Sequence, residues 1–182
     1  QKKYKREPIY TADIIIDGNK NESSIEKSKI SIRTDGDGDL KIWAVPNCLK
    51  VENRYLVSVD IGGKSSTSDY TVMTVIDRFG MLPTIKGKPK VVARWRGHVR
   101  HDKLAWMAAA LAHYYDDALL VIESNTADRE KNNNTEGDHF GSILNEIADY
   151  YDNLYQRTTS PEDVSDDVLA KYGFQTNKLT KG

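Results

Sequence analysis

Two acidic residues that lie far apart in the sequence each end a short apolar run. The first run, YLVSVD, ends in Asp60, and the second, ALLVIE, ends in Glu123. A carboxylate at the end of a buried strand is costly to desolvate unless a cation or a hydrogen-bond donor compensates it. If the two strands lie side by side, the two acids form an oxygen ligand pair that suits Mg²⁺ or Mn²⁺.

Such a pair indicates phosphodiester hydrolysis. In nucleases and polymerases, carboxylates hold two divalent cations about 3.5–4 Å apart, which activate a water and stabilise the leaving oxygen. The simpler interpretation of Asp60 is a turn acid before Gly62 and Gly63, and that of Glu123 is a strand-end salt bridge. Their joint placement at matching strand ends favours the metal site over either simpler interpretation.

The composition is that of an ordinary soluble globular chain, with 38% hydrophobic and 29% charged residues among 182. The formal net charge of −1 means that any site for a polyanion must be a local basic patch. The single Cys48 excludes an internal disulfide framework and a cysteine zinc cluster. No apolar run approaches the roughly 20 residues of a membrane span, and no signal peptide is visible, so we expect a cytoplasmic protein without membrane contact.

The order of the predicted elements places the two acids together. Strand-forming residues predict a meander of three strands, a helical period then replaces the alternation, and a short apolar strand follows; these elements cover 55–62, 70–78, 90–96, 101–115 and 118–123. A right-handed crossover would place the fourth strand parallel to the first and beside it. Parallel neighbours end at the same sheet edge, where α/β proteins tend to site their chemistry.

The expected fold is therefore an α/β, RNase H-like mixed sheet flanked by helices. Further helices are predicted near 143–151 and 163–172. Residues 1–50 are expected to form a small β-rich extension or linker, and residues 51–182 the main domain. Within the extension, TDGDGD at 34–39 separates two strand-like runs and predicts a hairpin turn between them.

Three strings carry a resemblance to a known family. They are VSVDIGGKSSTSDYTVMTVID, KVVARWRGH and HDKLAWMAAALAHYYDDALLVIESN. Together they resemble the nuclease domain of the large terminase subunit of tailed bacteriophages and prophages, over roughly residues 50–182. That family typically shows a VDxGxG…DY(S/T)V block, a WRGH-like strand end and a LLVxExN strand.

The resemblance implies an RNase H-like endonuclease that cleaves double-stranded concatemeric DNA during genome packaging in the cytoplasm of the bacterial host. It also implies an upstream packaging ATPase domain, a small terminase subunit and a portal as partners. No GxxxxGK(S/T) string occurs in this sequence, so this chain is not expected to power translocation. The chain begins at Gln1 without Met, and we expect it to be a piece of a longer polypeptide.

Carried over residue by residue, the resemblance makes Asp60 the first metal ligand and Glu123 the second. The family's third acidic ligand normally lies in a later helix, beyond a stretch like the one where this chain stops, so we expect it to be missing or replaced. Asp69, Asp128 and Asp138 are the available substitutes, and Asp69 comes closest to a motif position, although an acid there also caps turns.

The remaining candidates would contact DNA or lie near the site. Phosphate contacts from basic residues position a duplex without reading its sequence. The candidates for these contacts are Lys64, Arg94, Arg96, Arg100 and Arg129, for which solvated surface charge is the alternative. His139 is a further candidate near the site, since family members often have Gly and His after the Glu strand; the alternative is a structural histidine.

Two other interpretations remain open. An actin-like or sugar-kinase fold would use the turn after Asp60, with Lys64 and Ser65, to wrap nucleotide phosphates, but such kinases need two domains and 182 residues are too few. The chain could also fold as a nuclease fragment that is catalytically incomplete because the third ligand is absent.

Overall fold

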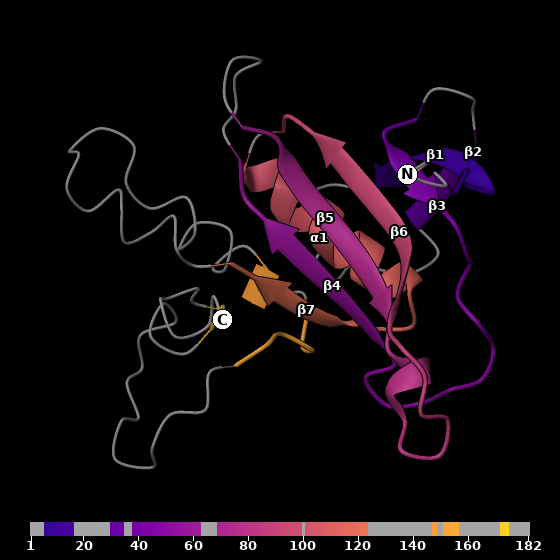
Figure 1. Ribbon diagram of the computed structural model, residues 1–182. Coiled ribbons are helices and arrows are strands. Elements are labelled where there is room, and N and C mark those ends of the chain that lie inside the picture. Colours follow the sequence, from indigo (N-terminus) through magenta and orange to yellow (C-terminus); the bar gives the residue numbers. More distant parts are fainter. Residues whose placement is uncertain are drawn as a thin grey trace, which may run out of the picture.

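The computed structural model describes residues 6–16, 30–34, 38–62, 69–99, 101–123, 147–148, 151–156 and 172–174. Its strands are β1 (Tyr10–Ile16), β2 (Ile30–Thr34), β3 (Leu40–Ile42), β4 (Tyr55–Asp60), β5 (Thr71–Asp77), β6 (Lys90–Gly97) and β7 (Leu119–Ile122). Helix α1 (His101–Tyr114) precedes β7, and a 3-10 turn, η2 (Phe79–Met81), lies between β5 and β6. The seven strands form one sheet in the order β2-β1-β3-β6-β5-β4-β7, with α1 behind it (Figure 1).

The central part of the sheet has the predicted topology. Strand β4 pairs antiparallel with β5, and β5 pairs antiparallel with β6. Helix α1 then carries the chain to β7, which pairs parallel with β4. The expected α/β fold, with an RNase H-like meander, helical crossover and parallel fourth strand, is thereby confirmed.

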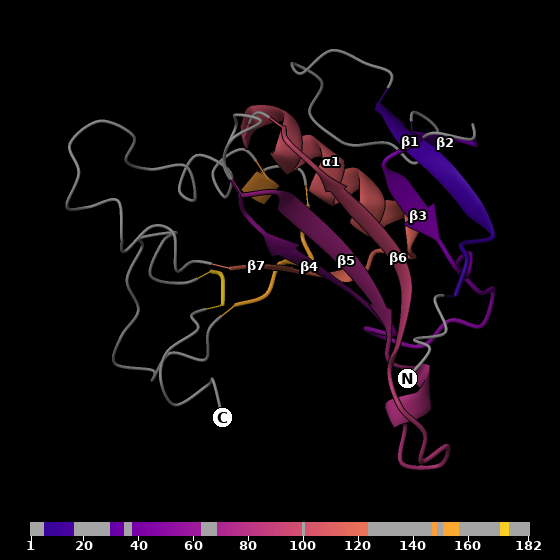
Figure 2. The ribbon, with the colours of Figure 1, turned by 45° about the horizontal axis from the view of Figure 1, so that its top comes forward.

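The N-terminal strands extend the same sheet. Strand β1 pairs antiparallel with β2 on one edge and with β3 on the other, and β3 pairs with β6 (Figure 2). The predicted hairpin at 34–39 is wrong, because β1 lies between the two strands that it was to join. At Gly38, a Cβ atom would lie 2.3 Å from the backbone of Ala12, so the chain enters β3 directly against β1.

One face of the sheet forms the core, and α1 covers it. A continuous row of residues crosses six strands at matching register and is buried throughout: Ile122, Val59, Met73, Trp95, Leu40 and Ala12. The helix faces this row with small side chains, since Ala105, Ala108 and Ala112 are fully buried, and it contacts β1, β4 and β7. Small residues let the helix approach the sheet closely. Because α1 covers this face, the polar side chains of the central strands lie on the opposite face.

The segments after β7 run along its outer edge. The amide of Tyr155 donates to the Leu120 carbonyl at 2.8 Å, and the amide of Phe174 donates to the Ile122 carbonyl at 2.8 Å. Of the further helices predicted, the structure describes one short helical stretch, residues 147–148, and Ile147 is buried in the core. The region 163–171 lies outside the described residues. No helix in the described part of the chain is long and apolar enough to cross a membrane.

Candidate metal centre

Asp60 and Glu123 are register neighbours on two parallel strands. The last printed pair of β4 and β7 is Val59 opposite Ile122, and the Glu123 amide donates to the Val59 carbonyl at 3.0 Å. One step further along both strands stand Asp60 and Glu123. Adjacent strands lie about 4.8 Å apart, so the two acids start from neighbouring backbone positions at one sheet edge. The structure therefore brings together the two acids that the crossover argument placed there.

Both acids belong to the sheet face that α1 does not cover. Along β4 and β7 the side chains alternate between the two faces, and Val59 and Ile122 are 1% exposed in the core. Asp60 and Glu123 follow these residues directly, and Asp60 is exposed while Glu123 is partly exposed. A ligand can therefore reach the pair from the open face of the sheet.

Negative charge accumulates at this edge. Although Asp60 is exposed, partial desolvation by the surrounding protein raises the pKa of its carboxyl, and the charges of Glu123 and Asp69 raise it further. Within the described residues, no Lys or Arg forms an ion pair with Asp60. A divalent cation would stabilise a carboxylate whose pKa is raised in this way and that forms no ion pair with a described Lys or Arg.

Asp69 comes close to the pair because the chain after β4 folds back onto the start of β5. The Gly62 amide donates to the Thr71 hydroxyl at 2.9 Å, and a Cβ on Gly62 would lie 2.3 Å from the Asp69 carbonyl oxygen. Asp69 is exposed and contributes negative charge toward Asp60. Among the described residues, no group of three or more His, Cys, Asp or Glu side chains is arranged to hold a metal ion. The role of Asp69 as a ligand stays a prediction.

Arg94 and Arg96 lie on the same open face as the acids. Both are exposed, whereas Trp95 between them is buried. Arg96 stands in the register row of Asp60, with Val72 of β5 between them. Two strand spacings separate the arginines from β4, about 10 Å. The two side chains therefore share one face of β6, and their contact with DNA stays a prediction.

A stacked cluster at the same edge was not singled out from the sequence. The Tyr70 ring stacks on the His98 ring, with centroids 4.3 Å apart and planes at 28°, and the Arg96 guanidinium lies 3.7 Å from the Tyr70 centroid. Tyr70 precedes β5 and His98 follows β6, so the pairing of these strands brings them together. The signal was present in the DY and WRGH strings, which place the three side chains at the strand ends.

Several predicted residues lie outside the described part of the chain. They are Lys64, Arg100, Arg129, His139, Asp128 and Asp138. The turn that a kinase-like fold would use for phosphates, residues 63–65, also lies outside it.

No protein-family model matches this chain, and no curated protein matches it. Among solved structures, it is similar to the large terminase nuclease from thermophilic phage G20c with bound magnesium, at 16% identity and a TM-score of 0.45, over 70% of this chain and 55% of that one. The same nuclease with bound zinc gives 16% identity and a TM-score of 0.43, over 70% and 60% of the two chains. The Thermus phage P74-26 large terminase nuclease domain gives 18% and 0.40, over 70% and 53%. In each case the match spans little more than half of the solved chain.

Proposed function

We propose that this chain is a metal-dependent endonuclease domain, the nuclease part of a phage or prophage large terminase subunit. The observation that carries the proposal is the placement of Asp60 and Glu123 as register neighbours on an open sheet face. The three sequence strings that resemble the terminase family support the same conclusion.

Asp60 and Glu123 are the proposed ligands. Mg²⁺ is commonly held by one or two carboxylates together with substrate phosphates and waters, so two acids on this face fit Mg²⁺ or Mn²⁺. A divalent ion, or a pair of them, held by these carboxylates would supply polarisation of the phosphate and an activated water. Because the pKa of Asp60 is raised, a proton competes with the ion at this carboxylate, and metal affinity is expected to rise with pH.

The basic residues on the open face are proposed to position the substrate. The Tyr70 ring lies against the Arg96 guanidinium, which leaves the edge of the guanidinium available to phosphate oxygens. Arg94 lies two residues before Arg96 on β6 and belongs to the same face. Contacts of this kind hold a backbone in place without reading bases, so we expect cleavage that is non-specific in sequence.

The finer assignments follow from the family resemblance. They are double-stranded concatemeric DNA as substrate, an upstream packaging ATPase domain, a small terminase subunit and a portal as partners, and the cytoplasm of the bacterial host as location. Asp69 is proposed as an additional ligand, Lys64, Arg100 and Arg129 as further DNA contacts, and His139 as a residue near the site.

The test is nicking of supercoiled plasmid with Mn²⁺ or Mg²⁺ and no nucleotide. Asp60→Asn and Glu123→Gln are each expected to lower the cleavage rate by about 100-fold or more, since metal ions contribute several kcal/mol to such reactions. The matched control is Glu52→Gln, an exposed acid in the turn before β4, at the opposite end of that strand.

Unchanged rates in both Asp60→Asn and Glu123→Gln would end the nuclease assignment. Metal binding by the unsubstituted chain without cleavage would instead identify a folded but catalytically incomplete site. Thermal stabilisation by ATP, with no cleavage, would favour the kinase-like alternative.

A further inference from the structure

A hollow of about 500 Å³ lies over the β1–β3–β6 part of the sheet, away from the candidate metal centre. Three of its lining residues are cationic: Arg6, Lys41 and Arg94. We propose that this hollow binds the sugar–phosphate backbone of duplex DNA, so that the N-terminal strands form part of the DNA-binding face. The proposal rests on the proposed nuclease function for its choice of ligand.

A polar row at one register links the hollow to the strands of the candidate metal centre. Ser58 of β4 pairs with Thr74 of β5, Thr74 with Arg94 of β6, Arg94 with Lys41 of β3, and Lys41 with Thr11 of β1. Each step is about 4.8 Å, so Lys41 lies about 14 Å from Ser58 across the sheet. The row lies on the open face, because one adjacent residue on each of its strands belongs to the buried core row: Val59, Met73, Trp95, Leu40 and Ala12.

The candidate metal centre belongs to the next row of the same face. Asp60 stands two residues beyond Ser58 along β4, which adds about 7 Å along the strand. The backbone positions of Asp60 and Lys41 are therefore about 16 Å apart on one continuous surface. The major groove of B-DNA is about 12 Å wide, roughly 4 Å less than this separation, and the long Lys41 side chain can span the difference. A duplex with one backbone at Asp60 can therefore place its other backbone within reach of the hollow.

The charges of the hollow suit a phosphate backbone. Glu7 is the one acid in its lining, against three cations. Among the described residues, neither Lys41 nor Arg94 forms an ion pair with an acid, although a paired surface cation occurs elsewhere in this chain, Lys50 with Asp116. Cations gathered around one concave surface without acidic partners raise the local concentration of polyanions.

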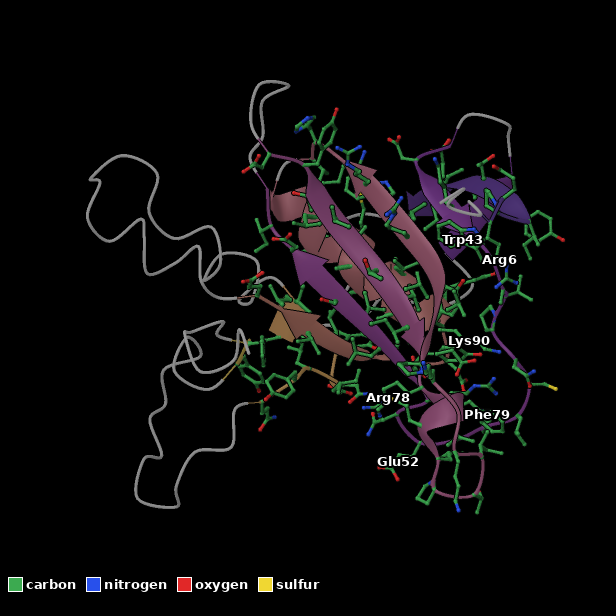
Figure 3. The ribbon with its side chains drawn as sticks, viewed as in Figure 1. Arg6, Trp43, Glu52, Arg78, Phe79 and Lys90 are labelled. Carbon is green, nitrogen blue, oxygen red and sulfur yellow. The ribbon has the colours of Figure 1, made fainter. Side chains whose placement is uncertain are left out.

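The segment that brings Arg6 to the hollow is fixed to β3. The Trp43 indole donates to the Arg6 carbonyl at 2.9 Å, and the Ile9 amide donates to the Ile42 carbonyl at 2.7 Å. Figure 3 shows Arg6 and Trp43 close together beside the N-terminal strands. The backbone of Arg6 is thus held beside β3 by contacts that do not involve its guanidinium group.

The experiment measures duplex binding separately from cleavage. In the full chain carrying Asp60→Asn, a labelled duplex of about 20 base pairs is titrated by fluorescence anisotropy between about 50 and 200 mM salt. Lys41→Gln and Arg94→Gln are each expected to weaken binding about 3–10-fold and to reduce the slope of log K against log salt by about 0.9. Lys41→Arg, which keeps the charge, should bind as the parent does.

The matched control is Lys88→Gln. Lys88 is exposed in the connection between β5 and β6. Figure 1 shows this connection at the end of the sheet where β4 begins, whereas Asp60 ends β4, so removal of the Lys88 charge should leave affinity and salt slope unchanged. If Lys41→Gln and Arg94→Gln bind like Lys88→Gln, or if the parent does not bind duplex at low salt, the inference is wrong.

Failure of the proposal for the hollow can be distinguished from failure of the nuclease proposal. Loss of cleavage in Asp60→Asn, together with unaltered binding in Lys41→Gln, would retain the nuclease and reject the hollow, because Lys41 belongs to the hollow and not to the proposed metal centre. Weakened binding in this variant, together with full cleavage by Asp60→Asn, would retain the hollow and reject the metal site.

Discussion

Asp60→Asn should have opposite effects on stability with and without a divalent ion. The substitution keeps the size of the side chain and removes one of two neighbouring negative charges. Unit charges about 5 Å apart repel by roughly 1 kcal/mol in water, and the exposure of Asp60 makes the value in water the appropriate one. In EDTA, Asp60→Asn should therefore raise the melting temperature by about 2–4 °C for a chain of this size.

Divalent ions should reverse this order. An ion that binds the folded state at ten times its dissociation constant stabilises it by about 1.4 kcal/mol, which corresponds to about 3–6 °C. The unsubstituted chain should show this gain with Mn²⁺, because it keeps both proposed ligands, Asp60 and Glu123. Asp60→Asn should gain little, so the unsubstituted chain becomes the more stable of the two.

The difference in EDTA should also depend on pH. The pKa of Asp60 is raised in the folded state, so the folded state binds this proton more tightly than the unfolded state. The resulting stabilisation is fully present below the unfolded pKa of about 3.9 and is lost as pH rises through the folded pKa. The advantage of Asp60→Asn should therefore be absent near pH 4 and fully developed at neutral pH.

The assay is thermal unfolding followed by fluorescence or circular dichroism, at several pH values from about 4 to 8, in EDTA and with Mn²⁺. Glu52→Gln, which removes an exposed acid far from the pair, should respond to Mn²⁺ as the unsubstituted chain does. The reasoning is refuted if Asp60→Asn is less stable in EDTA at neutral pH, or if it gains as much from Mn²⁺ as the unsubstituted chain.

Three further substitutions test the scaffold. Arg54 donates to both carboxylate oxygens of Asp77, at 3.1 and 2.9 Å, so Arg54→Met should cost about 3 kcal/mol by leaving a poorly exposed acid unpaired, measured as a lower urea midpoint. An unchanged midpoint would show that the pair contributes nothing. Gly62→Ala places a Cβ 2.3 Å from backbone atoms of the segment before β5, so cleavage should fall even in protein that remains folded; a wild-type rate would contradict the close packing. The Tyr115 hydroxyl donates to the Ala44 carbonyl at 2.9 Å, and Tyr115→Phe should cost about 1 kcal/mol in thermal unfolding without changing metal-dependent cleavage.

The sequence by itself determined the meander, the crossover helix and the position of the two acids. These features depend on local signals: alternation in β4 and β5, the helical period of α1, and an acid directly after each apolar run. The handedness of crossover connections then leaves one arrangement of β7 beside β4. That is why Asp60 and Glu123 could be placed together before their register was known.

The tertiary structure alone decided how the N-terminal strands join the sheet. A strand offers equivalent hydrogen-bonding groups on both edges, so the Asp-Gly turn signal could not show that β1 would insert between β2 and β3. The same non-local pairing sets Lys41 opposite Arg94 and Tyr70 against His98. Such contacts depend on packing over the whole sheet, because no pattern within either strand specifies the strand that it will meet.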